Sequence, residues 1–148
     1  MKISDIMSTE IITVQPETKI AQAAGLLLEH HVNGLPVVDA NNNLVGIICQ
    51  SDLIVQQKKL PVPTVFTLLD GLIPLSSMSH LEKEVQKMAA TTVQQAMTPN
   101  PTAVSPDTDL EDVADLMVNK NFHTIPVVDQ GKLVGIVGKE DVLKTLVK

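Results

Sequence analysis

The chain has 148 residues, of which 44% are hydrophobic, so one sizeable core or two small ones can be buried. Its formal net charge is -6, which argues against a nucleic-acid partner, because such a partner requires a broad basic face. Its basic residues are all lysines, so no arginine is available to bind a phosphate in bidentate fashion. The first ten residues lack the apolar run of a signal peptide, and no stretch reaches the roughly 18 apolar residues of a membrane span, so a cytoplasmic protein is expected.

The first part of the chain alternates extended and helical patterns. Residues 11–16 form a short extended pattern that ends at a proline. A helix is expected next, and its apolar stripe consists of Ile20, Ala23, Ala24, Leu27 and Leu28. Two apolar strands follow, at Leu35–Val38 and Leu44–Cys49, and their continuous apolar character predicts burial on both faces. A second helix is expected to start at Ser51.

Residues 59–92 are longer than a linker requires. Prolines and a glycine interrupt the apolar stretch Val65–Leu75, and Ser79 with Glu82 has the S-x-x-E spacing of a helix start. This segment is expected to be an extra hairpin or irregular arm packed on its own module. The alternative is a partner or dimer surface, because an apolar stretch such as Val65–Leu75 is unfavourable in water when uncovered. The expected units are therefore 1–58, the inserted arm and helix at 59–92, and 93–148.

The pattern of the first part returns in the second. Pro36–Asp39 and Pro126–Asp129 both read Pro-Val-Val-Asp, and Leu-Val-Gly-Ile follows each after a turn that is one residue shorter in the second copy. Further matched pairs are Met7 with Met97, Pro16 with Pro106, and Asp52 with Asp141. In the second copy Thr108 and Glu111 predict a capping box before the helix. This internal duplication predicts an α/β fold of two tandem β-α-β-β-α repeats that share a core.

The duplicated pattern resembles the CBS domain, and two copies in tandem resemble a Bateman module, over about residues 1–58 and 93–148. The resemblance implies a pseudo-two-fold module, often a homodimer. It implies a regulatory role in which AMP, ADP, ATP, S-adenosylmethionine or sometimes NADH binds in clefts between the repeats. A stand-alone sensor that acts on a separate, unidentified protein partner, with no cofactor beyond the regulatory ligand, is therefore expected.

The resemblance also implies the site residues. The family motif G-h-h-[ST]-x-x-D supplies a ribose-binding aspartate, and each cleft takes its base wall from one repeat and its aspartate from the other. The expected Asp141 cleft contains Met7, Ile12, Val32, Asn33, His123, Thr124, Ile136, Gly138, Lys139 and Asp141. The expected Asp52 cleft contains Met97, Thr102, Phe122, His123, Gly34, Ile47, Cys49, Ser51 and Asp52. The motif's hydroxyl is missing from both, because Cys49 and Gly138 stand in its place.

The two clefts are expected to differ in their affinity for a nucleotide. His123 is available for a phosphate in the Asp141 cleft, whereas the other cleft has only Asn33 and backbone groups, so the Asp141 cleft is expected to be the better nucleotide site. Structural alternatives stay open: both aspartates stand at helix starts, where they can act as caps, and His123 can be a surface turn residue. Phe122 can stack on a base or fill the core.

The sequence does not favour an enzyme, because it shows no nucleophile–base–acid set, metal cluster or glycine-rich phosphate loop. His30 and His31 end a predicted helix, where they complement its dipole, and no third metal ligand stands at matching spacing. Cys49, the only cysteine, is expected to be buried and inert. The alternative to a sensor is a non-catalytic dimerisation scaffold with degenerate ligand sites.

Overall fold

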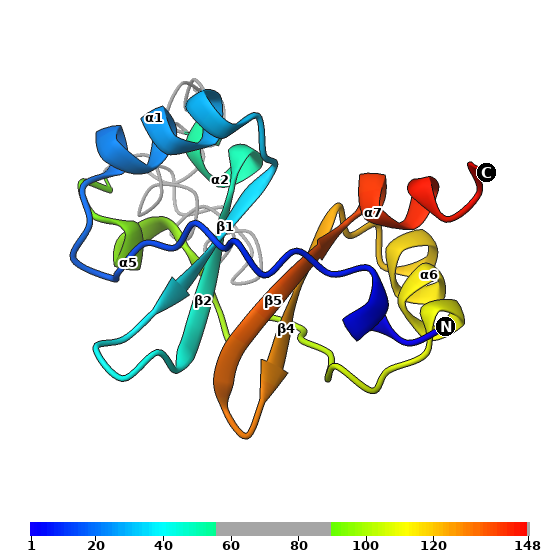
Figure 1. Cartoon of the computed structure of the whole chain (residues 1–148). Helices are drawn as coiled ribbons and strands as arrows, with labels where there is room; N and C mark the ends of the chain where they lie inside the picture. The colour runs from blue at the N-terminus through cyan, green and yellow to red at the C-terminus, as the bar shows by residue number, and fades with distance from the viewer. Residues whose placement is uncertain (56–89, 148) are drawn as a thin grey trace, which may run out of the picture.

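The computed structural model describes residues 1–55 and 90–147, which form two lobes side by side (Figure 1). The first lobe contains α1 (Ile20–His30), β1 (Gly34–Val38), β2 (Leu44–Cys49) and α2 (Gln50–Ile54). The second contains α6 (Leu110–Asn119), β4 (Thr124–Asp129), β5 (Lys132–Gly138) and α7 (Lys139–Lys144). The predicted arm at Val65–Leu75 and the helix start at Ser79 lie outside the described residues. Within the described ranges, no helix combines the length and apolar character needed to cross a membrane.

Each lobe is built around an antiparallel hairpin, in which β1 pairs with β2 and β4 pairs with β5. The extended segment before each first helix adds a parallel bridge, from Val14 to Val37 and from Val104 to Val127. β1 is buried along its whole length, as expected of a strand covered on both faces. The order of extended segment, helix, hairpin and helix, found twice, confirms the predicted fold class.

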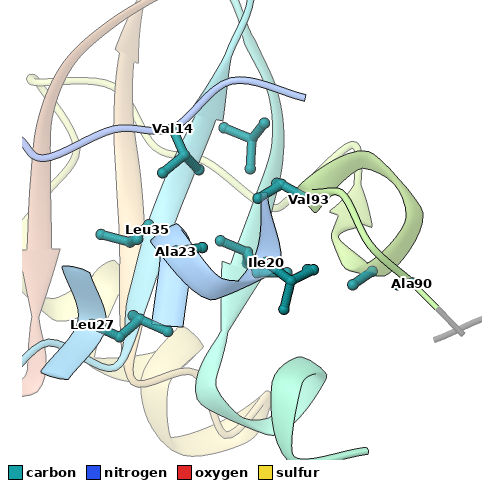
Figure 2. Packing of buried hydrophobic residues seen from close by; sticks show 10 residues of the cluster. Val14, Ile20, Ala23, Leu27, Leu35, Ala90 and Val93 are labelled. Atoms are coloured by element: carbon teal, nitrogen blue, oxygen red, sulfur yellow. The ribbon is translucent and has the colours of Figure 1, made fainter. Parts of the chain in front are cut away.

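The segment that opens each repeat packs in the lobe of the other repeat. The short helix η1 (Ile3–Asp5) lies beside α6 (Figure 1), and the fully buried Ile3 belongs to the same apolar cluster as Val113. In the opposite direction, α5 (Val93–Ala96) lies in the first lobe, where Figure 2 shows Val93 among side chains of α1 and β1. The repeats in the sequence and the packing units in space therefore differ by one exchanged segment each.

Equivalent backbone hydrogen bonds hold the two exchanged segments. The N–H of Ile3 donates to the carbonyl oxygen of Thr108 at 2.9 Å, and the N–H of Val93 donates to that of Thr18 at 2.8 Å. The strand β3 (Thr98–Pro99) extends the first sheet beside β2, while an isolated bridge at Ser8 extends the second sheet beside β5. This repetition of contacts gives the molecule its pseudo-two-fold symmetry.

An exposed ion pair adds to the docking of the N-terminal segment. The Lys2 Nζ lies 2.7 Å from Oδ1 of Asp109, the residue that precedes α6. Their hydrogen bond raises the pKa of Lys2 and lowers the pKa of Asp109. The contribution of Asp109 to stability is therefore lost as the pH falls through its folded-state pKa, and that of Lys2 as the pH rises through its own.

Two methionines reach from the opening segment of one repeat to a hairpin glycine of the other repeat, within the same lobe. Met97 lies against Gly46, and Met7 lies against Gly135, where an added Cβ would stand 2.5 Å from the Met7 Sδ. The same Cβ would also stand 3.2 Å from the carbonyl oxygen of Ser8. Each methionine therefore packs in the lobe of the glycine that it contacts, at a position that leaves room only for glycine beneath it.

Replacing Gly135 with alanine should lower the free energy of unfolding by about 1–2 kcal/mol, because the added methyl group overpacks the contact with Met7 and displaces its side chain. The matched control is Gly25→Ala, since a Cβ at this helical position meets nothing within 4 Å. The control should stabilise the protein by roughly 0.5–1 kcal/mol, the difference between alanine and glycine in a helix. Urea unfolding checks both variants, and an unchanged midpoint for Gly135→Ala would contradict the close contact.

Two local predictions are wrong. The T-x-x-E signature does not form a capping box, because α6 begins only at Leu110 and Thr108 Oγ1 instead accepts from the Ser105 N–H at 3.0 Å. Leu28 was placed in the buried stripe of α1 but is 73% exposed. It follows Leu27 directly, so it points about 100° away from the face that packs on the hairpin.

Candidate ligand clefts

Two cavities open between the lobes, and we name them the Asp141 cavity and the Lys120 cavity. The Asp141 cavity measures about 240 Å³ and is lined by Ser8, Glu10, Ile12, His31, Val32, Asn33, Gly34, Leu35, His123, Thr124, Ile136, Gly138, Lys139, Glu140 and Asp141. The Lys120 cavity measures about 680 Å³ and is lined by Asn33, Ile47, Cys49, Gln50, Ser51, Ile54, Thr98, Asn100, Pro101, Thr102, Lys120, Asn121, Phe122, His123, Thr124 and Pro126. The internal repeat relates most of the positions in the two sets.

The residues predicted for the Asp141 cleft come together in the structure, with one exception. Ile12, Val32 and Asn33 reach the cavity from the first repeat, and the segment 136–141 reaches it from the second. His123 and Thr124 line it at the start of β4. Met7 does not line it, because its side chain lies against Gly135 of β5 and packs with the apolar cluster of the second lobe.

The cleft predicted around Asp52 is only partly assembled. The predicted residues that line the Lys120 cavity are Ile47, Cys49, Ser51, Thr102, Phe122 and His123. Three others are absent from its lining: Met97 lies against Gly46, Gly34 lines the Asp141 cavity instead, and Asp52 is only 6% exposed.

Both aspartates cap the helix in which they stand. Oδ2 of Asp52 accepts from the N–H of Cys49 at 2.8 Å, and Oδ2 of Asp141 accepts from the N–H of Gly138 at 2.8 Å. They differ in access, because Asp52 is buried whereas Asp141 is half-buried and borders its cavity. A carboxylate has about four acceptor positions, so the Asp141 carboxylate can hold its cap and also accept from a ligand hydroxyl.

The reason for ranking the two clefts by His123 does not hold, because this exposed side chain lines both cavities. The second cavity also has a cation, Lys120, which sequence reasoning did not identify. Phe122 borders the Lys120 cavity while packing against the apolar cluster of the second lobe, so it contributes to the core, and stacking on a base stays a prediction. Cys49 is half-buried and borders the same cavity, which corrects the expectation of a buried thiol.

Several lining residues were missed by the predictions. Glu140 occupies the position of Ser51, which was predicted, so applying the alignment to both clefts would have found it. Ser8 and Thr98 occupy equivalent positions of the two copies, but neither was predicted and the alignment alone finds neither. Among the residues that the structure describes, no group of three His, Cys, Asp or Glu side chains could hold a metal ion.

Comparisons with known proteins agree with this architecture. The family model "CBS domain" matches residues 3–58 and 93–148. The chloroplastic CBS domain-containing protein CBSX2 of Arabidopsis thaliana is 35% identical over 136 residues, which span 88% of this chain and 56% of that protein. The whole-protein activity of this relative is thus not covered by the match.

Solved structures show the same arrangement. The crystal structure of CBSX2 in complex with AMP has a TM-score of 0.84 and 31% identity, and the match covers 98% of this chain and 95% of that one. The CBS domain pair of protein MJ0100, in complex with 5'-methylthioadenosine and S-adenosyl-L-methionine, has a TM-score of 0.69, 28% identity, and coverage of 99% and 95%. The chain therefore belongs to the CBS domain family and consists largely of two CBS domains in tandem.

Proposed function

We propose that the chain is a regulatory module that binds an adenosine-containing ligand between its two CBS domains and acts on a separate protein partner. The carrying observation is the Asp141 carboxylate, which borders a cavity walled by both repeats. The crystal structures of similar pairs with AMP, or with 5'-methylthioadenosine and S-adenosylmethionine, support this ligand class. The role requires no cofactor beyond the regulatory ligand and no catalytic residue, and a cytoplasmic location is part of the same proposal.

The lining of the Asp141 cavity suits a nucleoside. Ile12, Val32 and Ile136 provide the apolar walls that a base requires, and the Asp141 carboxylate can accept hydrogen bonds from a ribose diol. Because the two repeats supply different walls, a bound ligand interacts with both lobes and can favour one packing of the lobes over another. The affinity of a partner that contacts both lobes can thereby depend on which ligand is bound.

A thermal-shift panel with AMP, ADP, ATP, S-adenosylmethionine, 5'-methylthioadenosine and NADH tests this function. A ligand at a hundred times its dissociation constant stabilises the protein by about 2.7 kcal/mol, which corresponds to a rise in melting temperature of roughly 5–10 °C for a chain of this size. The guanine nucleotide GMP is the control for nonspecific anion binding. The absence of a shift with every adenosyl compound would contradict the proposed function.

Replacing Gly138 with serine should tighten ligand binding, because the family motif carries a hydroxyl at this position. An added Cβ would lie 3.7 Å from the His123 carbonyl oxygen and 3.8 Å from Asp141 Oδ2, so the cavity edge has room for it. One additional hydrogen bond contributes about 0.5–1.5 kcal/mol, or roughly two- to tenfold in affinity. Gly138→Ala is the matched control in calorimetric titrations, and equal affinities for the two variants would exclude a role for the hydroxyl.

The second candidate function is a dimerisation scaffold with degenerate ligand sites. Large apolar side chains are exposed at equivalent positions of both repeats: Leu28 corresponds to Val118, and Ile54 corresponds to Leu143, all at least 58% exposed. A symmetric pair of apolar faces suits a second copy of this chain, and a homodimer is compatible with either function. Loss of both motif hydroxyls favours the scaffold. If no adenosyl ligand raises the melting temperature, the scaffold is the better supported function.

A further inference from the structure

The two cavities are built from equivalent positions but differ in charge. Glu10 in the Asp141 cavity corresponds to Asn100 in the Lys120 cavity, and Glu140 corresponds to Ser51. All four side chains are exposed, so the carboxylates of Glu10 and Glu140 remain in water and act on a ligand mainly by their charge. The two clefts therefore share these positions, but only the Asp141 cavity has acidic groups at them.

The remaining ionisable groups widen this difference. Asp141 borders its cavity, whereas Asp52 is 6% exposed and is not among the described lining residues of the other. The Asp141 cavity thus has three carboxylates beside Lys139. The Lys120 cavity has a lysine and, among its described lining residues, no carboxylate.

The hydrogen-bonding groups at the pseudo-two-fold axis do not distinguish the clefts. His123, Asn33 and Thr124 line both cavities, so a ligand in either one has access to the same donors. Size adds to the contrast, since the cavity volumes are about 240 and 680 Å³. Only the larger value falls in the range of roughly 300–1,000 Å³ that is usual for ligand pockets, so the Lys120 cavity has more room for additional groups.

We propose that the two clefts sort adenosyl ligands by charge. The Asp141 cavity takes an adenosyl compound without phosphate, with an uncharged or cationic group at the 5' position, and the Lys120 cavity takes the 5'-phosphorylated form. A phosphate carries close to two negative charges at neutral pH, so the three carboxylates beside Lys139 disfavour it in the Asp141 cavity, while Lys120 favours it in the other. This inference rests on the proposed binding of adenosyl ligands.

A reciprocal exchange at the equivalent helix positions tests the inference. Calorimetric titrations of the full chain use AMP as the phosphorylated probe and 5'-methylthioadenosine as the uncharged one, with the variants Ser51→Glu, Glu140→Ser and Lys120→Gln. Ser51→Glu and Lys120→Gln should each weaken AMP binding about 1.5- to fivefold and leave 5'-methylthioadenosine unchanged, as expected for one exposed charge. Glu140→Ser should strengthen AMP binding at the Asp141 cavity by a similar factor.

The controls separate this inference from the proposed function. Both exchanged positions are exposed in the first turn of a helix, so unliganded melting temperatures should stay close to that of the parent chain. If both probes bind but their affinity ratio is unaltered in all three variants, the charge sorting is overturned while adenosyl binding stands. If neither probe binds the parent chain, both the sorting and the proposed function are overturned.

Discussion

Replacing Ile3 with alanine should lower the free energy of unfolding by about 2–5 kcal/mol, a large fraction of the stability of a chain this size. The Ile3 side chain is fully buried, and it packs with Val113, Ile125 and Val127 in the cluster of the second lobe. Truncation removes its apolar contacts and leaves a cavity that the surrounding strands and helix can close only in part. Urea unfolding of the full chain measures the loss.

The exchanged packing also predicts which lobe is destabilised by the loss of Ile3. Although Ile3 opens the first repeat, its removal should reduce the hydrogen-exchange protection of β4 and β5 more than that of β1 and β2. Leu28→Ala is the control, because Leu28 is 73% exposed and its loss should change stability by no more than about 0.5 kcal/mol. Greater loss of protection in β1 and β2 would show that Ile3 belongs to the first lobe.

Replacing Asp141 with alanine should weaken binding of 5'-methylthioadenosine or S-adenosylmethionine by about 1–3 kcal/mol, whereas Asp52→Ala should weaken it less. The Asp141 carboxylate borders its cavity and can accept from a ribose diol. The Asp52 carboxylate is 6% exposed, so a ligand has little access to it. Isothermal titration of both variants with the same ligand measures the difference.

Both aspartate variants have a structural cost. Each loses a cap hydrogen bond of 2.8 Å to the N–H three residues earlier, a loss of about 0.5–2 kcal/mol in stability. Melting curves without ligand establish that each variant is folded, and Asp141→Asn separates the charge of Asp141 from its cap bond. Equal losses of affinity in Asp141→Ala and Asp52→Ala would rule out the asymmetry.

The duplicated sequence was sufficient to predict the fold, because its two copies carry the same apolar strands, turns and helix spacing in the same order. Its local helix signal failed at Thr108, whose carbonyl oxygen accepts from Ile3 and whose hydroxyl closes a turn at Ser105. The local turn with Ser105 therefore uses the hydroxyl that the capping pattern requires. The exchange of opening segments was equally hidden, since Ile3 and Val93 have the same apolar character whichever lobe they fill.

The candidate site was predictable as far as the resemblance to the CBS domain assigned residue positions to each cleft. The segments around Val32 and Ile136 were assigned to one cleft, and the structure brings them together. Side-chain direction was not predictable: Met7 lies against Gly135 in the second lobe, and Asp52 is buried while its counterpart Asp141 reaches a cavity. Positions that the repeat makes equivalent in sequence therefore differ in their surroundings.

The exchange of η1 and α5 also bears on how a chain of this kind could arise. A single repeat, with its opening segment placed in another lobe, lacks Ile3 or Val93 from its own core. Two copies related by a two-fold axis supply each other's missing segment, so the smallest complete unit is a reciprocal pair. The present chain has the form of such a pair fused into one polypeptide. If the opening segment of one repeat is deleted, the segment that the other lobe lacks is the one that a separate copy of that repeat would supply.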